Sequence, residues 1–163
     1  MLYLEENSSY LVDSLLDLGV SYCSLTILDL HGNSSFSKSS SDKWHRIYIE
    51  SDLFKGCHLM KEAAQQLGNA TGGFSFVWDN YKAINEESLY LNQLRKENNI
   101  DHGVALCSPL SGGNFSILTV AGGRWDVNFA KNALVNKQLI YKAVMSALLS
   151  NKQSSSYSAK RSY

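Results

Sequence analysis

Three aromatic residues with a polar tip are the side chains in this sequence best suited to hold a small molecule. Trp44 and Tyr48 are four residues apart, and Trp78 ends the segment FSFVW. Each side chain joins a large apolar ring to one hydrogen-bond donor, which suits a ligand with an apolar body and a polar head. The same spacing on a helix is also common in an ordinary hydrophobic core. The pattern by itself therefore leaves both interpretations open.

Cys57 and His58 are the pair that could support nucleophilic catalysis. Adjacent residues on a helix point about 100° apart, so the spacing favours a buried thiol beside a surface histidine. A small hydrolase or lyase that uses Cys57 is the weakest alternative. Phosphate-binding loops, dinucleotide-binding motifs and the nucleophile elbow are absent, so we predict that the protein is not an enzyme.

Neither the histidines nor the cysteines are spaced as metal ligands are. The three cysteines, Cys23, Cys57 and Cys107, lie far apart in the sequence and form no CxxC pair. We expect three reduced, buried thiols, with no metal site and no cofactor.

Length and charge restrict the possible partners. The chain has 163 residues, a mass of 18.1 kDa, and 15 basic against 15 acidic residues, which indicates one domain without the basic surface of a nucleic-acid-binding protein. No apolar run approaches the roughly 20 residues that span a bilayer, and the first residues lack the basic start of a signal peptide. We expect a cytoplasmic protein that contacts neither membrane nor nucleic acid directly.

Hydrophobic periodicity and turn residues predict alternating helices and strands. Helices are expected over about residues 5–18, from residue 41 or 42 to Gly68 with a break near Gly56, over Glu86–Asn98 and over Asp126–Leu149. Strands are expected over Ser21–Leu30, Ser34–Lys38, Phe74–Trp78, Gly103–Leu110 and Phe115–Ala121. This order predicts an α/β (α+β) fold, an α-β-α sandwich with a central antiparallel sheet of about five strands, as in PAS- and GAF-like domains. Residues 1–149 would form the domain, and the Ser-rich residues 150–163 a disordered tail or linker.

Three segments, taken in order, resemble the N-terminal autoinducer-binding domain of LuxR-type quorum-sensing regulators. They are Trp44-x-x-x-Tyr48, FSFVWDN at 74–80 and ENNIDHGVALCSPLSGGNFSILTVAG at 97–122. The resemblance covers roughly residues 10–149 and implies a sensor that binds an acyl-homoserine lactone or a related amphipathic signal in an internal pocket. In that family a helix-turn-helix DNA-binding domain follows. This chain stops at Tyr163, as an excised sensor domain or a natural short form would.

The resemblance also implies roles for individual residues. Trp44 corresponds to the tryptophan that donates to the lactone carbonyl, Tyr48 to the tyrosine beside the acyl part, and Trp78 to the tryptophan packed against the lactone. Thr119 stands at the hydroxyl position that meets the amide region of the ligand. Ser40 stands where many members have a second tyrosine. These five residues, together with Cys57, form the predicted ligand site.

Cys57 marks the largest departure from the family pattern. Thirteen residues after Trp44 the family has an aspartate that accepts the amide N–H of the ligand, and here Cys57 occupies that position. A thiol is a weak acceptor, whereas a hydrogen bond to a charged group contributes about 1.5–3 kcal/mol. Asp52 would replace the aspartate only if the alignment shifted by five residues. The identity of the ligand is therefore left open.

Two functions follow from these observations. The first is a ligand-sensing domain that forms homodimers or heterodimers, as in LuxR-type transcriptional regulation. The alternative is a truncated LuxR-like protein that binds a full-length regulator as an interaction partner or anti-activator, without a ligand. The missing aspartate and the missing DNA-binding domain motivate this alternative. A bound lipophilic molecule would favour the sensor, and complex formation with a regulator would favour the anti-activator.

Overall fold

A single antiparallel sheet organises the fold. The computed structural model describes the backbone of residues 10–29, 31, 33–69 and 72–159. The strands are β1 (Tyr22–Leu28), β2 (Ser34–Ser39), β3 (Phe74–Val77), β4 (His102–Pro109) and β5 (Phe115–Gly122). Their order in the sheet is β2-β1-β5-β4-β3, and every neighbouring pair is antiparallel. The predicted α+β class and the five-stranded antiparallel sheet are confirmed.

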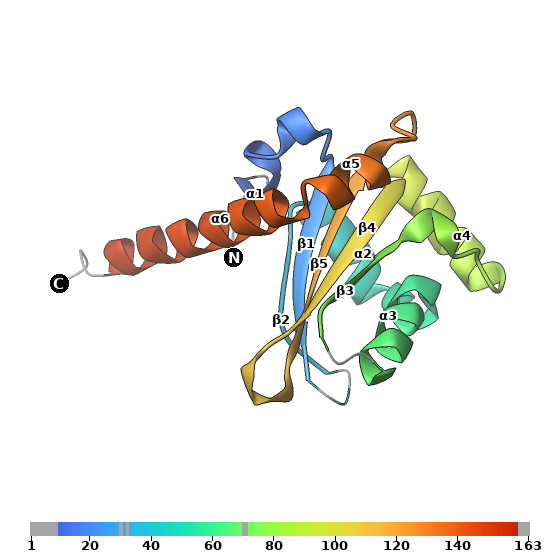
Figure 1. Cartoon of the computed structure of the whole chain (residues 1–163), viewed down its shortest axis with the longest axis horizontal. Coiled ribbons are helices and arrows are strands. Elements are labelled where there is room, and N and C mark those ends of the chain that lie inside the picture. The colour runs from blue at the N-terminus through green and yellow to red at the C-terminus, as the bar shows by residue number, and fades with distance from the viewer. Residues whose placement is uncertain (1–9, 30, 32, 70–71, 160–163) are drawn as a thin grey trace.

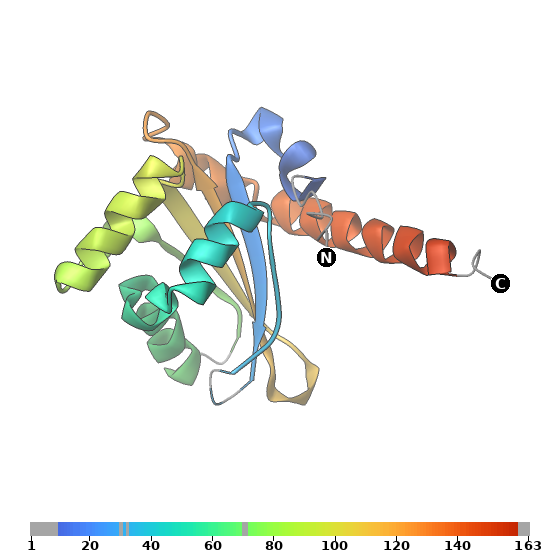
Figure 2. The same ribbon diagram turned by 180° about the vertical axis from the view of Figure 1, so that it is seen from behind.

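Helices cover both faces of the sheet. They are α1 (Tyr10–Asp13), α2 (Asp42–Glu50), α3 (His58–Asn69), α4 (Glu86–Glu97), α5 (Phe129–Val135) and α6 (Lys137–Ala159). Short 3-10 helices are η1 (Leu16–Leu18), η2 (Leu53–Gly56), η3 (Trp78–Asn80) and η4 (Ser111–Gly113). Figures 1 and 2 show α1, α5 and α6 on one face and α2, α3 and α4 on the other.

Side-chain alternation along the strands builds two separate hydrophobic layers. In β1, Cys23 and Leu25 pack in the layer that contains α1, α5 and α6, while Tyr22 and Leu28 pack in the layer under α2 and α3. Successive residues of a strand point to opposite faces, so one strand supplies both layers. The α-β-α sandwich follows from this alternation.

The first predicted helix is interrupted within its described residues. The predicted helix over residues 5–18 appears as α1 and η1, separated by a turn, and its residues 5–9 lie outside the described part of the chain. Gly19 ends η1 with a φ of 76°, a conformation that glycine adopts without steric cost, as predicted for a stop at this position.

The last predicted helix, over Asp126–Leu149, is wrong at both ends and in the middle. The structure has two helices, which start at Phe129 and end at Ala159. They are divided at Asn136, whose side-chain amide donates to the backbone carbonyl of Asn132 at 2.8 Å and so competes with the helix ladder. Beyond Leu149 the chain has no Gly or Pro, and an established helix extends at little cost.

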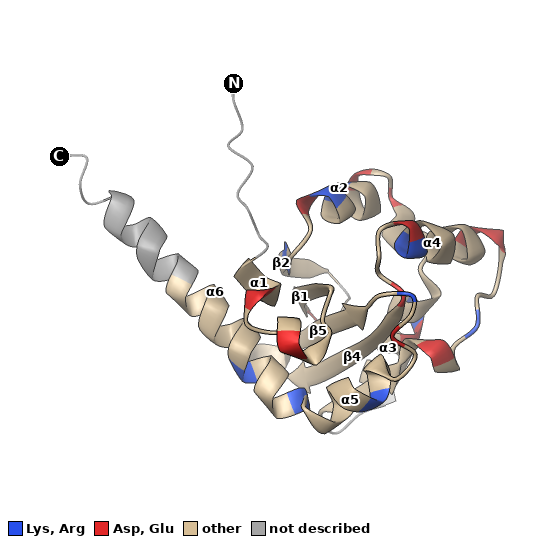
Figure 3. Cartoon of the chain, turned by 90° about the horizontal axis from the view of Figure 1, so that it is seen from above, with Lys and Arg blue, Asp and Glu red and all other residues tan. Residues whose placement is uncertain are grey.

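The surface carries charges of both signs. Figure 3 shows Lys and Arg beside Asp and Glu on α2 and α4. In the described ranges, no helix has the length and hydropathy needed to cross a bilayer. Within the same ranges, no group of three His, Cys, Asp or Glu side chains could hold a metal ion.

Candidate ligand-binding site

A cavity lies between the sheet and the layer formed by α2, η2 and α3. Its volume is about 590 Å³. Protein interiors rarely leave voids larger than a water molecule, whereas small-molecule sites typically measure about 300–1,000 Å³. The cavity is therefore large enough for a ligand of metabolite size.

Helix α2 supplies the aromatic wall of the cavity. Ser41 caps this helix by accepting a hydrogen bond from the backbone N–H of Trp44 at 3.1 Å. This agrees with the helix start predicted at residue 41 or 42. Trp44 and Tyr48 then fall one turn apart and stack with ring centroids 5.8 Å apart. Tyr48 also meets the ring of Phe54 edge-on at 6.3 Å. This stack fixes where both polar tips lie.

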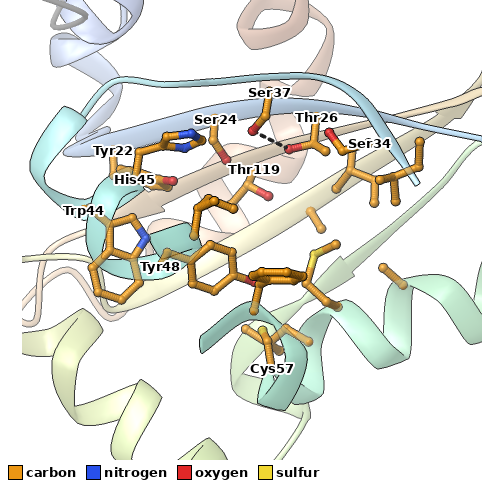
Figure 4. A pocket seen from close by; sticks show the side chains of 18 of the residues that line it. Tyr22, Ser24, Thr26, Ser34, Ser37, Trp44, His45, Tyr48, Cys57 and Thr119 are labelled. Carbon is orange, nitrogen blue, oxygen red and sulfur yellow. Dashed lines mark hydrogen bonds between the residues drawn. The ribbon is translucent and has the colours of Figure 1, made fainter. Parts of the chain in front are cut away.

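The sheet supplies a wall with several hydroxyl groups. Tyr22, Ser24 and Thr26 alternate along β1 and line the cavity, and Thr119 of the adjacent β5 lines it beside Ser24, its partner in the ladder. Figure 4 shows the labelled side chains of the sheet facing Trp44 and Tyr48 of α2, with Cys57 on a third side. The remaining wall is largely apolar, with contributions from Leu28, Leu59, Met60, Ala63, Phe76, Ala105 and Ile117. The lining thus combines hydroxyl and indole groups with an apolar region.

The donors in this lining include two that have no hydrogen-bond partner in the described part of the chain. These are the indole N–H of Trp44 and the hydroxyl of Thr119. Burial holds the pKa of Tyr48 well above its ordinary value, the nearby Cys57 raises it further, and the charge of Arg95 opposes this shift. Tyr48 therefore keeps its proton at neutral pH. The indole N–H of Trp44 and the hydroxyl of Thr119 are therefore available to a polar ligand group.

Five of the six predicted site residues are brought together. Trp44, Tyr48, Cys57, Trp78 and Thr119 all line the cavity.

Ser40 does not join them, because its hydroxyl accepts the backbone N–H of Cys23 at 3.0 Å at the end of β2. Asp52, the other carboxylate considered for this site, has a side chain that is 65% exposed and pairs with Lys55 at 3.3 Å. Neither Ser40 nor Asp52 is positioned to meet a ligand in the cavity.

Gly103 allows Trp78 to lie against β4. A Cβ atom at Gly103 would come within 2.3 Å of the indole of Trp78, so only glycine leaves room for the ring. The sequence predicts Trp78 as the last residue of the preceding strand. In the structure this strand ends at Val77, and Trp78 begins η3. This turn carries its ring over the start of β4.

We expect Gly103→Ala to destabilise the domain by about 1–3 kcal/mol, because the added methyl group displaces the indole. Chemical denaturation would measure the change. Gly72→Ala is the matched control, since a Cβ there meets no atom within 4 Å, and it should leave stability nearly unchanged. Equal effects of the two substitutions would contradict the role assigned to Gly103.

His102 anchors the turn that carries Trp78. Its ring nitrogens lie 2.8 Å from the carboxylate of Asp79 and 3.1 Å from the carbonyl of Arg124. Both partners are acceptors, so they favour the doubly protonated ring. Burial lowers the pKa of His102, but the bonds to Asp79 and Arg124 outweigh it and leave the pKa above its usual value. This pairing ties η3 to β4 and to the segment after β5.

The pair Cys57 and His58 is not arranged for catalysis. His58 is buried, at 5% exposure, which corrects its expected surface position. Its Nε2 bonds to the carbonyl of Tyr81 at 3.2 Å, and burial lowers its pKa. The sulfur of Cys57 instead accepts a hydrogen bond from Arg95. The histidine is therefore committed elsewhere and does not activate the thiol.

The three cysteines are buried and reduced, as predicted. Burial raises the pKa of Cys23 and of Cys107 to about 12. Both of these side chains therefore stay protonated at neutral pH.

Arg95 is the cavity residue that the sequence analysis missed. It lies on α4, is 6% exposed, and places its guanidinium 5.2 Å from the ring centre of Trp78. Its Nη2 donates to the sulfur of Cys57 at 2.9 Å. Its position four residues after Leu91 was the available signal, because that spacing puts Arg95 on the buried face of α4.

No protein-family model and no curated protein matches this chain in sequence. Solved structures do match it in fold. CepR2 from Burkholderia cenocepacia, an N-acylhomoserine-lactone-dependent LuxR-family transcription factor, has a TM-score of 0.61 at 11% identity over 85% of this chain and 81% of its own. The ligand-binding domain of VqsR from Pseudomonas aeruginosa has a TM-score of 0.52 at 15% identity over 88% of both chains.

SdiA of Escherichia coli is a further match. Its complex with octanoyl-rac-glycerol has a TM-score of 0.57 at 14% identity over 93% of this chain. The matched region spans 62% of the SdiA chain. These neighbours are regulatory proteins and not enzymes. The five-stranded sheet, the helical layers on both faces and the neighbours together give this chain the fold of the ligand-binding domain of LuxR-family regulators.

Proposed function

We propose that this chain is a ligand-sensing domain that binds an acyl-homoserine lactone or a related amphipathic signal inside the cavity. The observation that carries the proposal is the cavity of about 590 Å³ with an apolar wall and unpaired polar groups. CepR2 is named as dependent on an acylhomoserine lactone, and SdiA is bound to octanoyl-rac-glycerol. Both ligands join an acyl chain to a polar head, and we extend that ligand class to this chain.

The ligand would use the two walls differently. Its acyl chain would lie against Phe76, Ile117 and Met60, where each buried CH₂ contributes about 0.8 kcal/mol. Trp44, Tyr48 and Thr119 would hold the polar head, with Cys57 and Trp78 beside it. We assign this function to residues 1–149 acting in the cytoplasm, with residues 150–163 as a tail or linker.

The first test is ligand-induced thermal stabilisation of the whole chain. A ligand at 100 times its Kd adds about 2.7 kcal/mol to the folded state, which corresponds to a rise in Tm of about 5–10 °C for a domain of this size. Thr119→Val removes one donor at nearly constant shape, and Trp44→Phe removes one donor while keeping a smaller aromatic ring. We expect both to reduce the shift while leaving the Tm of the free protein within a few degrees.

Tyr90→Phe is the control, because it also removes one hydrogen-bond donor. Tyr90 is exposed on α4 and lines no described part of the cavity. Native mass spectrometry of protein expressed with and without acyl lactones would give ligand mass and stoichiometry together. Unchanged shifts in both Trp44→Phe and Thr119→Val would contradict the assigned head-group contacts.

A second candidate function is pairing with a LuxR-type regulator, either as a dimerising sensor or as an anti-activator. Val135 and Leu139 are exposed apolar side chains at the junction of α5 and α6, and they motivate this candidate. Size-exclusion chromatography of this chain mixed with a full-length regulator would test it. Complex formation that Val135→Asp abolishes would support the pairing, and separate elution would contradict it.

A further inference from the structure

Arg95 places a fixed positive charge on the wall of the cavity. Among the described residues that line the cavity, it is the single Arg or Lys, and no Asp or Glu is present. A guanidinium stays protonated at any physiological pH. The cavity therefore has a positive side, which a neutral head group does not require.

Among the described residues, no carboxylate forms an ion pair with this guanidinium. Its two hydrogen bonds go to the sulfur of Cys57 at 2.9 Å and to the amide oxygen of Asn92 at 3.0 Å. The third contact is the ring face of Trp78. Buried arginines are almost always paired, because a charge removed from water without a partner is strongly unfavourable.

Carboxylates on the outer side of Arg95 do not fill this role. A second cavity of about 440 Å³ touches Arg95 and is lined by Asp79 and Asp101. Asp79 is bound to His102 at 2.8 Å, and in the described part of the chain neither carboxylate is within 4.0 Å of a guanidinium nitrogen. In the part of the chain that the structure describes, Arg95 therefore has no direct ion pair on either side.

The phenols of Tyr48 and Tyr22 line the same cavity as Arg95. Arg95 is close enough to Tyr48 and Tyr22 to lower the pKa of both phenols against the larger effect of their burial. Cys57 lies between Arg95 and Tyr48. Guanidinium and phenol groups are both hydrogen-bond donors to a carboxylate.

From this arrangement we infer that the cavity binds an amphipathic carboxylate, with its acid group on Arg95 and its acyl chain against the apolar wall. The inference rests on the proposed function and specifies the head group of the ligand. A carboxylate fits because it accepts two parallel N–H bonds from one guanidinium. No Asp or Glu is present among the described residues that line this cavity, so the ligand would supply the acid.

The test compares four probes that share one acyl chain and differ in the head. Octanoic acid and N-octanoyl-homoserine carry a carboxylate, whereas N-octanoyl-homoserine lactone and octanoyl-glycerol are neutral. Titration calorimetry at pH 7.5 with the whole chain would give four dissociation constants. We expect at least one acid to bind about 10- to 100-fold more tightly than both neutral probes, as a charge-assisted bidentate contact implies. The two acids distinguish a fatty acid from an acylated amino acid as the source of the carboxylate.

Three variants test whether Arg95 causes the preference for acids over neutral probes. Arg95→Met keeps the length and removes the charge, and it should abolish the preference for acids while changing the affinity for neutral probes only a few-fold. Arg95→Lys keeps the charge without the planar fork and should retain a smaller preference. Lys96→Gln removes a neighbouring, exposed charge of the same helix and should behave as the wild type.

The free protein gives an independent readout. Arg95 has no ion-pair partner among the described residues, so we expect the Tm of Arg95→Met to be no lower than that of the wild type. If Arg95 served only to hold Cys57 and Trp78, its replacement would lower the Tm. If Arg95→Met does not fold, the role is structural and the inference is overturned.

The two proposals fail in different ways. Neutral probes that bind as tightly as acids, in the wild type and in Arg95→Lys, would overturn the carboxylate and leave the sensing function intact. Failure of all four probes to bind the wild type would overturn the proposed function together with the inference.

Discussion

Ala105→Phe is expected to abolish ligand binding while the domain stays folded. Ala105 is central in β4, between its ladder partners Phe76 and Thr119, and it lines the cavity. A phenyl ring at this position would occupy the space between the sheet and α2 that we assign to the ligand. We expect binding to weaken by more than about 100-fold, because the ligand and the ring cannot share the volume.

Ala133→Phe is the matched control for this substitution. Ala133 is buried on α5, in the layer on the opposite face of the sheet. Overpacking there is expected to cost about 1–3 kcal/mol, whereas Ala105→Phe should cost little, because its ring enters open space. Chemical denaturation and calorimetric titration would separate the two effects. Equal destabilisation by both substitutions would show that the volume beside Ala105 is closed and would contradict the cavity.

Phe129→Ala is expected to cause the largest loss of stability. Phe129 is 0% exposed at the start of α5, and its ring lies over Gly122 at the end of β5, where a Cβ would approach within 2.7 Å. Gly19 lies beside the same ring. Truncation of a buried phenylalanine costs about 3–5 kcal/mol, through lost transfer energy and the void left behind. That is a large part of the stability of an ordinary domain.

Val127→Ala provides the comparison for Phe129. Val127 is only two residues earlier and is 70% exposed, so its truncation should change the free energy of unfolding by no more than about 0.5 kcal/mol. Urea denaturation monitored by tryptophan fluorescence would measure both variants. Ligand affinity of folded Phe129→Ala should be unchanged, because Phe129 packs on the face away from the cavity. A loss below 1 kcal/mol would contradict the packing of α5 on the sheet.

Periodicity found most of the secondary structure because each pattern is local. Alternation in residues 22–28 and the turn at Ser111–Asn114 placed the strands correctly, and Ser41 marked the start of α2. The errors lie where local preference and tertiary packing disagree. Asn136 interrupts a continuous apolar stripe by bonding backward to Asn132, and the polar residues after Leu149 continue a helix that a composition rule would end.

Trp44, Tyr48, Trp78, Cys57 and Thr119 were predicted as one site and do line one cavity, although their ligand contacts are still a proposal. Their grouping came from a resemblance to a family, because residues so far apart share no local pattern. Ser40 was assigned to the same site by position alone. The structure shows it bonded to the backbone of Cys23 instead, since its side chain completes the end of the β1–β2 ladder.

The amino-acid sequence by itself determined the order of helices and strands, the alternation that divides β1 into two faces, and the absence of a carboxylate thirteen residues after Trp44. These are properties of neighbouring residues or of composition. Only the tertiary structure decided that Arg95 meets Cys57 across 38 positions of sequence and leaves its charge in the cavity wall. Such a contact depends on how α4 packs against η2, and long-range packing of this kind leaves no periodic signal in the chain.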